Sequence, residues 1–445
     1  MMESILIVNA AIVSEGGITA GDVYVKAGRI AQIGPDLASR SADRVIDAQG
    51  NILLPGLIDD QVHFREPGLT HKGDLVSESR AAVAGGITSY MEMPNTHPPT
   101  TSAARLEDKY QSAAGRSYAN YSFYLGATND NLQEIKALDP LSSCGVKVFM
   151  GSSTGNLLVD DGDALEAIFA HSPVIVATHC EDDTLIGENA RRCREIYGED
   201  VPMSEHPRIR SEEACYRSTA HAVALARKHG TRLHILHLTT ARELSLLSAR
   251  PADEKTITAE ACVHHLHFDE TAYAAKGTRI KCNPAIKSPA DRRALLDAVG
   301  DGRIDVIATD HAPHTMEEKQ RPYFQAPAGL PLVQHALVCL LEHYHEGRMS
   351  LPLIAEKTAH APARLFQLKD RGYIREGYWA DLTLVDIHRR CRVDEQPVFA
   401  RCGWTPFDGV IFRSTVDTTI VSGQLAYRNG RIDSPPAGMR LAFDR

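Results

Sequence analysis

The chain has 445 residues, with 48 basic and 57 acidic side chains and a formal net charge of −9. Hydrophobic residues make up 43% and charged residues 24%, which is ordinary for a globular protein and excludes collagen-like, disordered and small disulfide-stapled chains. The mild acidic balance argues against a nucleic-acid partner, because phosphate binding needs clustered lysine and arginine. No stretch approaches the roughly 20 apolar residues that span a membrane, and the opening MMESILIVNAAIV predicts a strand rather than a signal peptide. Nine scattered cysteines without a CxxC pair predict reduced thiols and a cytoplasmic protein.

Both ends of the chain carry the pattern of short strands joined by tight turns. Residues 1–54 contain the apolar runs ILIVNAAIV, DVYVKAGRIAQIG and RVIDAQGNILL. The same pattern of short apolar runs and turns occurs in residues 372–445, where Asn429-Gly430 predicts a hairpin turn. We therefore expect residues 1–54 and 372–445 to combine into one small β-sandwich domain, with residues 55–371 forming a second domain.

The middle of the chain alternates between strand-like runs and helical patterns. Helical periodicity is clear in SESRAAVAGG, DALEAIFAHS and EEACYRSTAHAVALARKHG. The strand-like runs are NILLPGLIDDQVHF, GITSYMEM, SYANYSFYLGAT, GVKVFM, PVIVATHC, RLHILHL, KTITAEACVHHL and RIDVIATDHA. Eight strands with helices between them predict an α/β fold of the (β/α)8 barrel type, although a doubly wound sheet can reach the same number. In a barrel the active site lies at the carboxyl ends of the strands.

Residues able to bind a metal recur at the ends of these runs. In the first run Gln61, His63 and Arg65 alternate with apolar residues and so share one face of the strand. The later runs carry Lys147, His179, His234, His237 and Asp310. Imidazole and carboxylate groups are usual zinc ligands, with an open position for water in catalytic sites. One strand histidine is usually a packed core residue, but recurrence at successive strand ends favours a metal centre.

An ordered set of motifs resembles a known family. PGLIDDQVHFREPG, MPNT, THCED, HILHLTT, TAEACVHHL, NPAIK and ATDHAPH are similar, in that order, to the dihydroorotases of the amidohydrolase superfamily. The terminal segments, including GYIREGYWADLTLVD, resemble the small β-sandwich that accompanies the barrel there. The resemblance implies a metal-dependent hydrolase that reversibly interconverts N-carbamoyl-L-aspartate and (S)-dihydroorotate in de novo pyrimidine (UMP) synthesis, with a small-molecule substrate and one or two zinc ions.

The resemblance also implies roles for individual residues. His63 would bind the first metal, and His179 and His237 the second. Asp310 would serve both as a ligand and as the proton carrier. Lys147 matches a lysine that is carboxylated and bridges two metals in many superfamily members, a modification that the site needs because an ammonium group would repel a divalent cation.

One metal-binding position departs from the family pattern. Gln61 stands where the family usually has the first histidine of His-x-His, and an amide oxygen is a weaker zinc ligand than imidazole. The first metal is therefore expected to be weakly bound, water-ligated or absent.

Arg65 is the candidate for binding the substrate, because it can hold a carboxylate through two parallel hydrogen bonds. The alternative role for Arg65 is a salt bridge with Glu66. The substrate-contacting positions implied by the resemblance are Arg65, Asn95, Asn283, His314, Ala328 and Gly329. Asn283 lies in NPAIK, a departure from the more usual NPP-x-R. Residues 313–327 are expected to form a lid.

Two other functions stay open at this point. One is a related cyclic amidohydrolase of the hydantoinase or allantoinase type, against which Arg65 argues because hydantoins need carry no carboxylate. The other is a non-catalytic dihydroorotase-like scaffold, with Gln61 as the sign of decay. His264 and His265 are left out of the ligand set, because they either support the ligands from behind or are structural, and the oligomeric state, a homodimer included, is left open.

Overall fold

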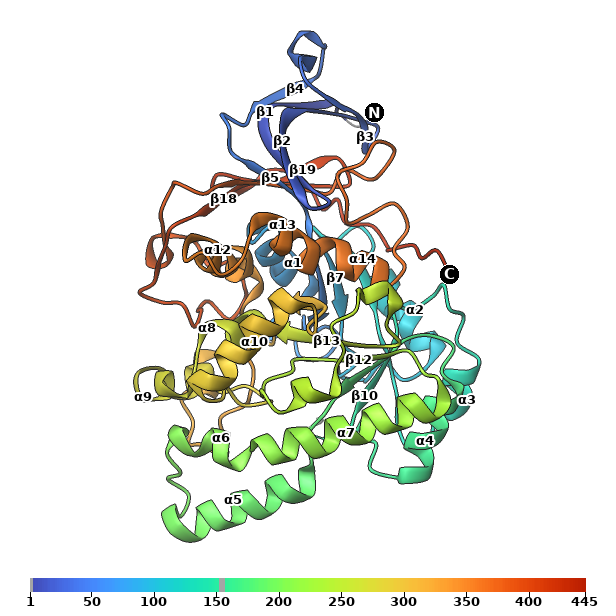
Figure 1. Ribbon diagram of the computed structural model, residues 1–445, viewed down its shortest axis with the longest axis vertical. Helices are drawn as coiled ribbons and strands as arrows, with labels where there is room; N and C mark the ends of the chain where they lie inside the picture. The colour runs from blue at the N-terminus through green and yellow to red at the C-terminus, as the bar shows by residue number, and fades with distance from the viewer. Residues whose placement is uncertain (1–2, 152–156) are drawn as a thin grey trace.

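The terminal segments of the chain meet in one sheet. The computed structural model describes residues 3–151 and 157–445 and places the first strands beside the last ones, at the top of Figure 1. The sheet runs in the order β20-β19-β18-β15-β5-β1-β2-β3, with β4 also paired to β1. Its strands are β1 (Ile5–Ser14), β2 (Gly17–Lys26), β3 (Arg29–Gly34), β4 (Arg44–Asp47), β5 (Ile52–Pro55), β15 (Leu382–Asp386), β18 (Thr415–Val421), β19 (Gln424–Arg428) and β20 (Arg431–Ile432).

Apolar alternation explains why the two ends pair. Ile5 and Ile7 from the first strand and Leu382 and Leu384 from β15 belong to one buried cluster, as period-two patterns on facing strands predict. The direct link is antiparallel pairing between β5 and β15. The predicted turn at Asn429-Gly430 joins β19 to β20, with φ of 47° and 83° as a primed hairpin turn requires. The terminal segments thus share a sheet, and the exact domain boundaries stay a prediction.

The predicted barrel strands run parallel and close into a ring. They are β6 (Leu57–Val62), β7 (Ile87–Glu92), β8 (Asn120–Phe123) with its continuation β9 (Leu125–Gly126), β10 (Val146–Phe149), β11 (Val176–His179), β12 (Leu233–Ile235), β13 (Ile257–Cys262) and β14 (Val306–Ala308). Neighbouring strands pair from β6 to β8 and from β9 to β14. A parallel bridge between Val62 and His311 joins the last strand region to the first, and His63 N donates to the His311 carbonyl at 2.7 Å. The α/β fold with parallel strands expected from the sequence is confirmed, and these pairings agree with its predicted barrel form.

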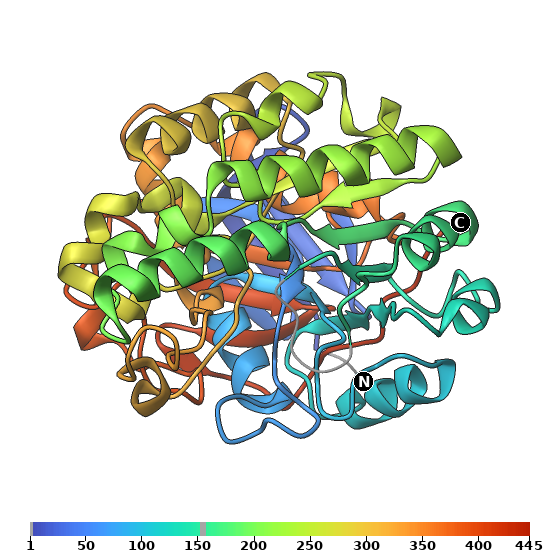
Figure 2. The ribbon, with the colours of Figure 1, turned by 90° about the horizontal axis from the view of Figure 1, so that it is seen from below.

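Helices surround the strands, as Figure 2 shows from below. The longer ones are α1 (Leu75–Ala84), α2 (Ala103–Ala113), α4 (Gly162–His171), α5 (Asp183–Tyr197), α7 (Glu212–His229), α10 (Pro289–Asp301) and α12 (Ala336–His345). The short ones are α3 (Leu132–Lys136), α6 (His206–Ile209), α8 (Val263–His267), α9 (Tyr273–Lys276), α11 (Met316–Lys319), α13 (Leu351–Ala355) and α14 (Ala361–Leu365). A short hairpin of β16 (Cys391–Arg392) and β17 (Ile411–Phe412) lies in the C-terminal segment. Within the described ranges, no helix is long and apolar enough to cross a membrane.

One predicted strand is shorter than its apolar pattern. The run KTITAEACVHHL continues to Leu266, but β13 ends at Cys262, and residues 263–267 form the helix α8. Cys262 is the last residue of β13 that pairs with β14, opposite Ala308. Beyond it the backbone has no strand to pair with, and helical hydrogen bonds satisfy its polar groups instead. All nine cysteines are free thiols, as expected.

Candidate metal and active site

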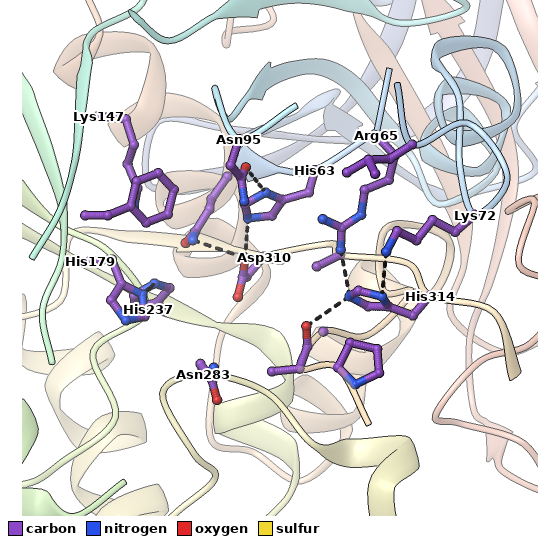
Figure 3. A pocket seen from close by; sticks show the side chains of 17 residues that line it. His63, Arg65, Lys72, Asn95, Lys147, His179, His237, Asn283, Asp310 and His314 are labelled. Carbon is purple, nitrogen blue, oxygen red and sulfur yellow. Dashed lines mark hydrogen bonds and ion pairs between the residues drawn. The ribbon is translucent and has the colours of Figure 1, made fainter. Parts of the chain in front are cut away.

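A cavity of about 360 Å³ opens at the carboxyl ends of the barrel strands, and Figure 3 shows the side chains that line it. All the predicted site residues lie on its wall: Gln61, His63, Arg65, Asn95, Lys147, His179, His237, Asn283, Asp310, His314, Ala328 and Gly329. They come from seven different strand ends and loops, and the closed ring brings them together because parallel strands end on the same side. Five further residues complete the lining: Leu69, Lys72, Phe149, Ala312 and Pro327.

Asp310 lies at the centre of the cavity and contacts two side chains from the end of β6, the first barrel strand. Its Oδ1 lies 3.0 Å from His63 Nε2 and accepts a hydrogen bond of 3.1 Å from Gln61 Nε2. On its other side the His63 ring contacts Asn95 Oδ1 at 2.7 Å. Gln61 therefore presents its amide N–H to Asp310, so it acts as a donor toward the carboxylate where imidazole would offer a lone pair to a cation.

His179 and His237 form a pair in which two ring nitrogens face each other. His179 Nδ1 lies 2.9 Å from His237 Nε2. The opposite nitrogen of His179, Nε2, lies 2.9 Å from Glu181 Oε2, and Glu181 also pairs with Arg210. When the Glu181 carboxylate accepts a hydrogen bond from Nε2–H, the lone pair of the His179 ring lies on Nδ1 and is directed at His237. This is the orientation in which a metal-binding histidine is held by a carboxylate behind it.

Lys147 is buried against the same cavity. Its side chain is 1% exposed, and no carboxylate oxygen of the described residues lies within 4.0 Å of its Nζ. The ammonium group sits 4.6 Å from the centre of the Phe149 ring. Burial lowers the pKa of Lys147 to about 8, against the smaller opposing effect of Asp310. A buried lysine without an anionic partner is unfavourable as an ammonium ion.

The opposite side of the cavity is cationic. Arg65 donates through Nε to the Pro313 carbonyl at 3.1 Å, and its Nη2 lies 3.0 Å from His314 Nε2. Lys72 Nζ lies 3.2 Å from the other ring nitrogen of His314. Burial and the charge of Arg65 hold the pKa of His314 well below its usual range, against the opposing effect of Glu318. In Figure 3 this group faces the two histidines across Asp310.

The alternative pairing of Arg65 with Glu66 is wrong. Glu66 binds Arg116 instead, at 2.8 Å, because Arg65 has a φ of 72° and the backbone turns the two side chains apart. Within the described residues, no carboxylate lies within 4.0 Å of the Arg65 guanidinium. The buried cation therefore has hydrogen-bond capacity left for an anion in the cavity.

The segment predicted to be a lid forms one wall of the cavity. Residues 313–327 contain α11, and the buried Lys319 donates from Nζ to the carbonyls of Lys281, Pro327 and Gly329 at 3.0, 2.9 and 2.9 Å. These bonds hold the backbone at Ala328 and Gly329 against the cavity. Asn283 reaches the wall from the loop before α10, and its Oδ1 has no hydrogen-bond partner in the described part of the chain. That residues 313–327 open and close over the cavity as a lid stays a prediction.

Sequence reasoning missed two residues of this site. Lys72 follows seven residues after Arg65 in a loop, and no periodic pattern points to it. Glu181 had a usable pattern, because a carboxylate two residues after a strand-end histidine can support that histidine from behind.

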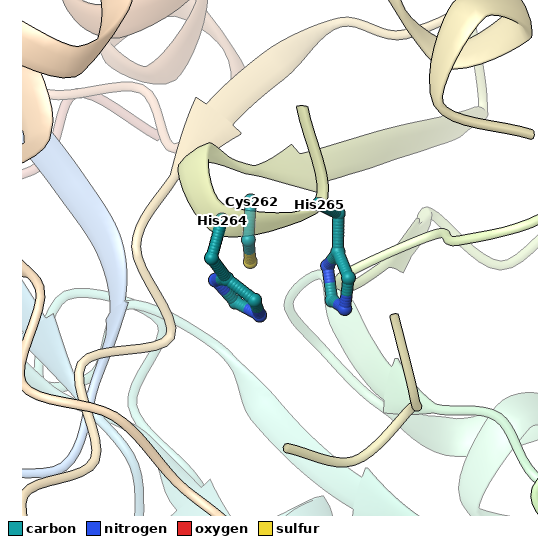
Figure 4. Close-up of side chains that lie close together, drawn as sticks. All are labelled: Cys262, His264 and His265. Carbon is teal, nitrogen blue, oxygen red and sulfur yellow. The ribbon is translucent and has the colours of Figure 1, made fainter. Parts of the chain in front are cut away.

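A second cluster of metal-binding types adjoins the cavity at the junction of β13 and α8 (Figure 4). The ligand atoms of Cys262, His264 and His265 all lie within 4.8 Å of one another. Cys262 Sγ donates to Glu260 Oε1 at 3.2 Å and lies 3.9 Å from Gln61 Oε1. A thiol and two neutral imidazoles carry no net charge, although both ring nitrogens of His264 and Nδ1 of His265 have no hydrogen-bond partner among the described residues.

Comparison with known proteins identifies the family of the chain. The model of the amidohydrolase family matches residues 52–426. The chain belongs to the amidohydrolase family. It is 34% identical to a dihydroorotase of Methanothermobacter thermautotrophicus, over 92% of either chain. It is also 32% identical to an allantoinase of Solibacter usitatus, over 97% of this chain and 95% of the relative.

The solved structures show the same architecture. L-hydantoinase from Arthrobacter aurescens superimposes with a TM-score of 0.94 and 26% identity, over 99% of this chain and 100% of that one. The predicted resemblance to dihydroorotases and the amidohydrolase fold are thus confirmed, and the chain is a hydrolase of the group that acts on cyclic amides. Relatives of three activities share this fold, so the identity of the substrate depends on the residues of the cavity.

Proposed function

We propose that the protein is a dihydroorotase, which interconverts (S)-dihydroorotate and N-carbamoyl-L-aspartate in pyrimidine synthesis. The observation that carries this proposal is the buried Arg65, 7% exposed, on the wall of the cavity that also holds the predicted metal ligands. A guanidinium without a protein carboxylate is suited to a substrate carboxylate, which it can bind through two parallel hydrogen bonds. Dihydroorotate carries that carboxylate beside its ring amide, whereas hydantoin and allantoin do not.

The donor set supports one or two zinc ions. His179 and His237 present facing ring nitrogens, and imidazole is a preferred zinc ligand. We propose that Lys147 is carboxylated, because the modification removes a buried ammonium group and supplies oxygen ligands. His63 and Asp310 would hold the other ion, with Gln61 bound to Asp310 instead of the metal. A divalent cation bound there lowers the pKa of a water molecule and polarises a carbonyl oxygen.

The side chains of the protein supply orientation and proton transfer. Arg65 and His314 hold the carboxylate, and Asn95, Asn283 and the backbone of Ala328 and Gly329 are placed to contact the ring. Asp310 receives the proton of the attacking water and delivers it to the ring nitrogen as the amide bond breaks. Its contacts with His63 and Gln61 fix the direction of the carboxylate. In ring closure the same proton moves backward, from the carbamoyl nitrogen to Asp310.

A substrate panel tests the proposal. Purified protein would be assayed in both directions with (S)-dihydroorotate and N-carbamoyl-L-aspartate, and for hydrolysis of dihydrouracil, hydantoin and allantoin. We expect kcat/KM for dihydroorotate to exceed that for the rings without a carboxylate by at least 100-fold, because a site built around a charged hydrogen bond rejects a substrate that lacks it. Preference for hydantoin or allantoin would replace the proposal with that activity, and no turnover of any ring by metal-loaded protein would favour a scaffold.

A further inference from the structure

A group of ionisable side chains lies inside the barrel, outside the cavity described above. Asp60 from β6, His234 from β12 and Glu260 from β13 are each 0% exposed, and their ligand atoms all lie within 4.8 Å of one another. His234 Nε2 is 3.1 Å from Asp60 Oδ2 and 3.9 Å from Glu260 Oε2. None of the three side chains lines the active-site cavity.

The proton positions of His234 follow from its neighbours. Thr258 Oγ1 donates to the Leu233 carbonyl at 3.2 Å, so its hydrogen is used there and it accepts from His234 Nδ1 at 2.9 Å. Nδ1 therefore carries a proton, and in the neutral ring the lone pair lies on Nε2, facing the two carboxylates. Histidines that bind a metal through one ring nitrogen usually donate the N–H of the other nitrogen to a neighbouring acceptor, which fixes the tautomer.

The contact between His234 and Asp60 is not a hydrogen bond. Despite the distance of 3.1 Å, a hydrogen on Nε2 would not point at Oδ2 within the angle and distance that a hydrogen bond needs. Across residues 3–151 and 157–445, both carboxylate oxygens of Asp60, Nε2 of His234 and Oε2 of Glu260 have no hydrogen-bond partner. Four buried polar atoms of one group of three side chains thus lack partners, which is rare in a folded protein.

Charge gives the same result. Without a cation, burial and the neighbouring Asp60 raise the pKa of Glu260 well above its usual range, because two ionised carboxylates beside a neutral imidazole would carry a charge of −2. No lysine or arginine nitrogen of the described chain lies within 4.0 Å of either carboxylate. Burying such a charge without a cation is strongly unfavourable. A divalent ion makes the group neutral and satisfies all three side chains.

We propose that Asp60, His234 and Glu260 bind a divalent transition-metal ion inside the barrel, separate from the active-site metals. Two carboxylate oxygens and one imidazole nitrogen suit zinc, manganese or ferrous iron, whereas magnesium and calcium favour oxygen ligands alone. Bonds of about 2.1 Å in a tetrahedral site place ligand atoms about 3.4 Å apart, and the separations of 3.1 and 3.9 Å lie on either side of that value.

The ion would connect the interior to the active site. Glu260 uses its other oxygen, Oε1, to accept the backbone N–H of His237 at 3.0 Å. His237 has a φ of 38°, a conformation that needs support in a residue other than glycine. By fixing Glu260, the ion would help to hold the backbone that positions the His237 ring. The cluster of Cys262, His264 and His265 also contains unpartnered ring nitrogens, but it has no carboxylate whose charge a cation would neutralise.

Metal content and anomalous diffraction test the site together. Wild type, Asp60→Asn and Glu260→Gln would be purified without chelator and analysed for all first-row metals. Glu243→Gln is the matched control, because Glu243 is also a buried glutamate but is satisfied by Thr219 and Thr240 at 2.6 and 2.7 Å. We expect each of the two test variants to lose one equivalent of metal per chain and the control to lose none.

Crystals of the wild type locate the ion whether or not the variants fold. Anomalous difference maps at the absorption edge of the metal found should show a peak within about 2.2 Å of Asp60, His234 and Glu260, in addition to any peak at His179 and His237. A metal-replete crystal without the inner peak would overturn the proposal, as would a peak at Cys262 in place of the inner one. The outcome is independent of the substrate, so failure of the dihydroorotase assignment would leave it unaffected.

Discussion

Replacing Arg65 by lysine tests the contact on which the substrate assignment depends. Arg65 is 7% exposed, its Nε is occupied by the Pro313 carbonyl, and its Nη2 lies beside His314. Lysine keeps the positive charge and a similar length, but its single nitrogen cannot bind two carboxylate oxygens in parallel. The substitution therefore removes the paired geometry while keeping the electrostatic attraction.

The expected effect follows from one lost charged hydrogen bond. Such a bond contributes about 1.5–3 kcal/mol, and each 1.36 kcal/mol is a factor of ten in rate or affinity. Arg65→Lys should therefore lower kcat/KM for dihydroorotate by about 10- to 160-fold. Most of the loss should appear as a higher KM for both dihydroorotate and carbamoyl-aspartate, because the carboxylate is bound in the ground state and the transition state alike.

The control is a substrate that cannot use the contact. The methyl ester of dihydroorotate has the same ring and scissile amide without the anionic group, so wild type and Arg65→Lys should hydrolyse it at similar rates. Thermal unfolding of both proteins checks that the buried lysine leaves the fold intact. An unchanged KM for both natural substrates would refute the reasoning and place the carboxylate elsewhere in the cavity; an equal loss on the ester would show that Arg65 supports the site without binding the anion.

Four further changes test the remaining roles. Asp310→Asn should reduce kcat by about 10²- to 10⁴-fold with the fold intact, since proton transfer by a side chain contributes that much; activity within tenfold of wild type would contradict it. Lys147→Ala should lose active-site metal and activity together, with partial recovery of both on adding short carboxylic acids, and full metal content would exclude a bridging carboxylate. Gln61→His should tighten metal binding, measured by chelator competition, because imidazole is the better zinc ligand. Lys319→Met should raise KM and the rate of proteolysis within residues 313–327, because three backbone carbonyls lose their donor; wild-type values of both would show that the wall is held by other contacts.

Local pattern was sufficient to predict the strands and most of the site. Each barrel strand is a short apolar run, and His179 and Asp310 stand at or just beyond the end of such a run. A parallel ring brings all carboxyl strand ends to one side, so the residues of the cavity could be chosen without knowing how neighbouring strands are registered. Local apolar pattern also makes the predicted strand through Cys262 too long. Its apolar residues continue into α8, and only the end of pairing with β14 ends the strand.

Contacts that depend on backbone direction or on strand register were decided only by the tertiary structure. The left-handed φ of Arg65 separates it from Glu66, and no residue type at that position indicates such a turn. The inner group joins Asp60 of β6 to His234 and Glu260 of the neighbouring strands β12 and β13, which lie far from β6 in the chain. Whether their side chains converge depends on the stagger of the strands around the closed barrel, since a shift of one residue would turn each to the opposite face. The sequence alone thus determined which residues end the strands, because that information is contained in a few neighbouring residues, whereas closure of the ring decided which of them meet inside it.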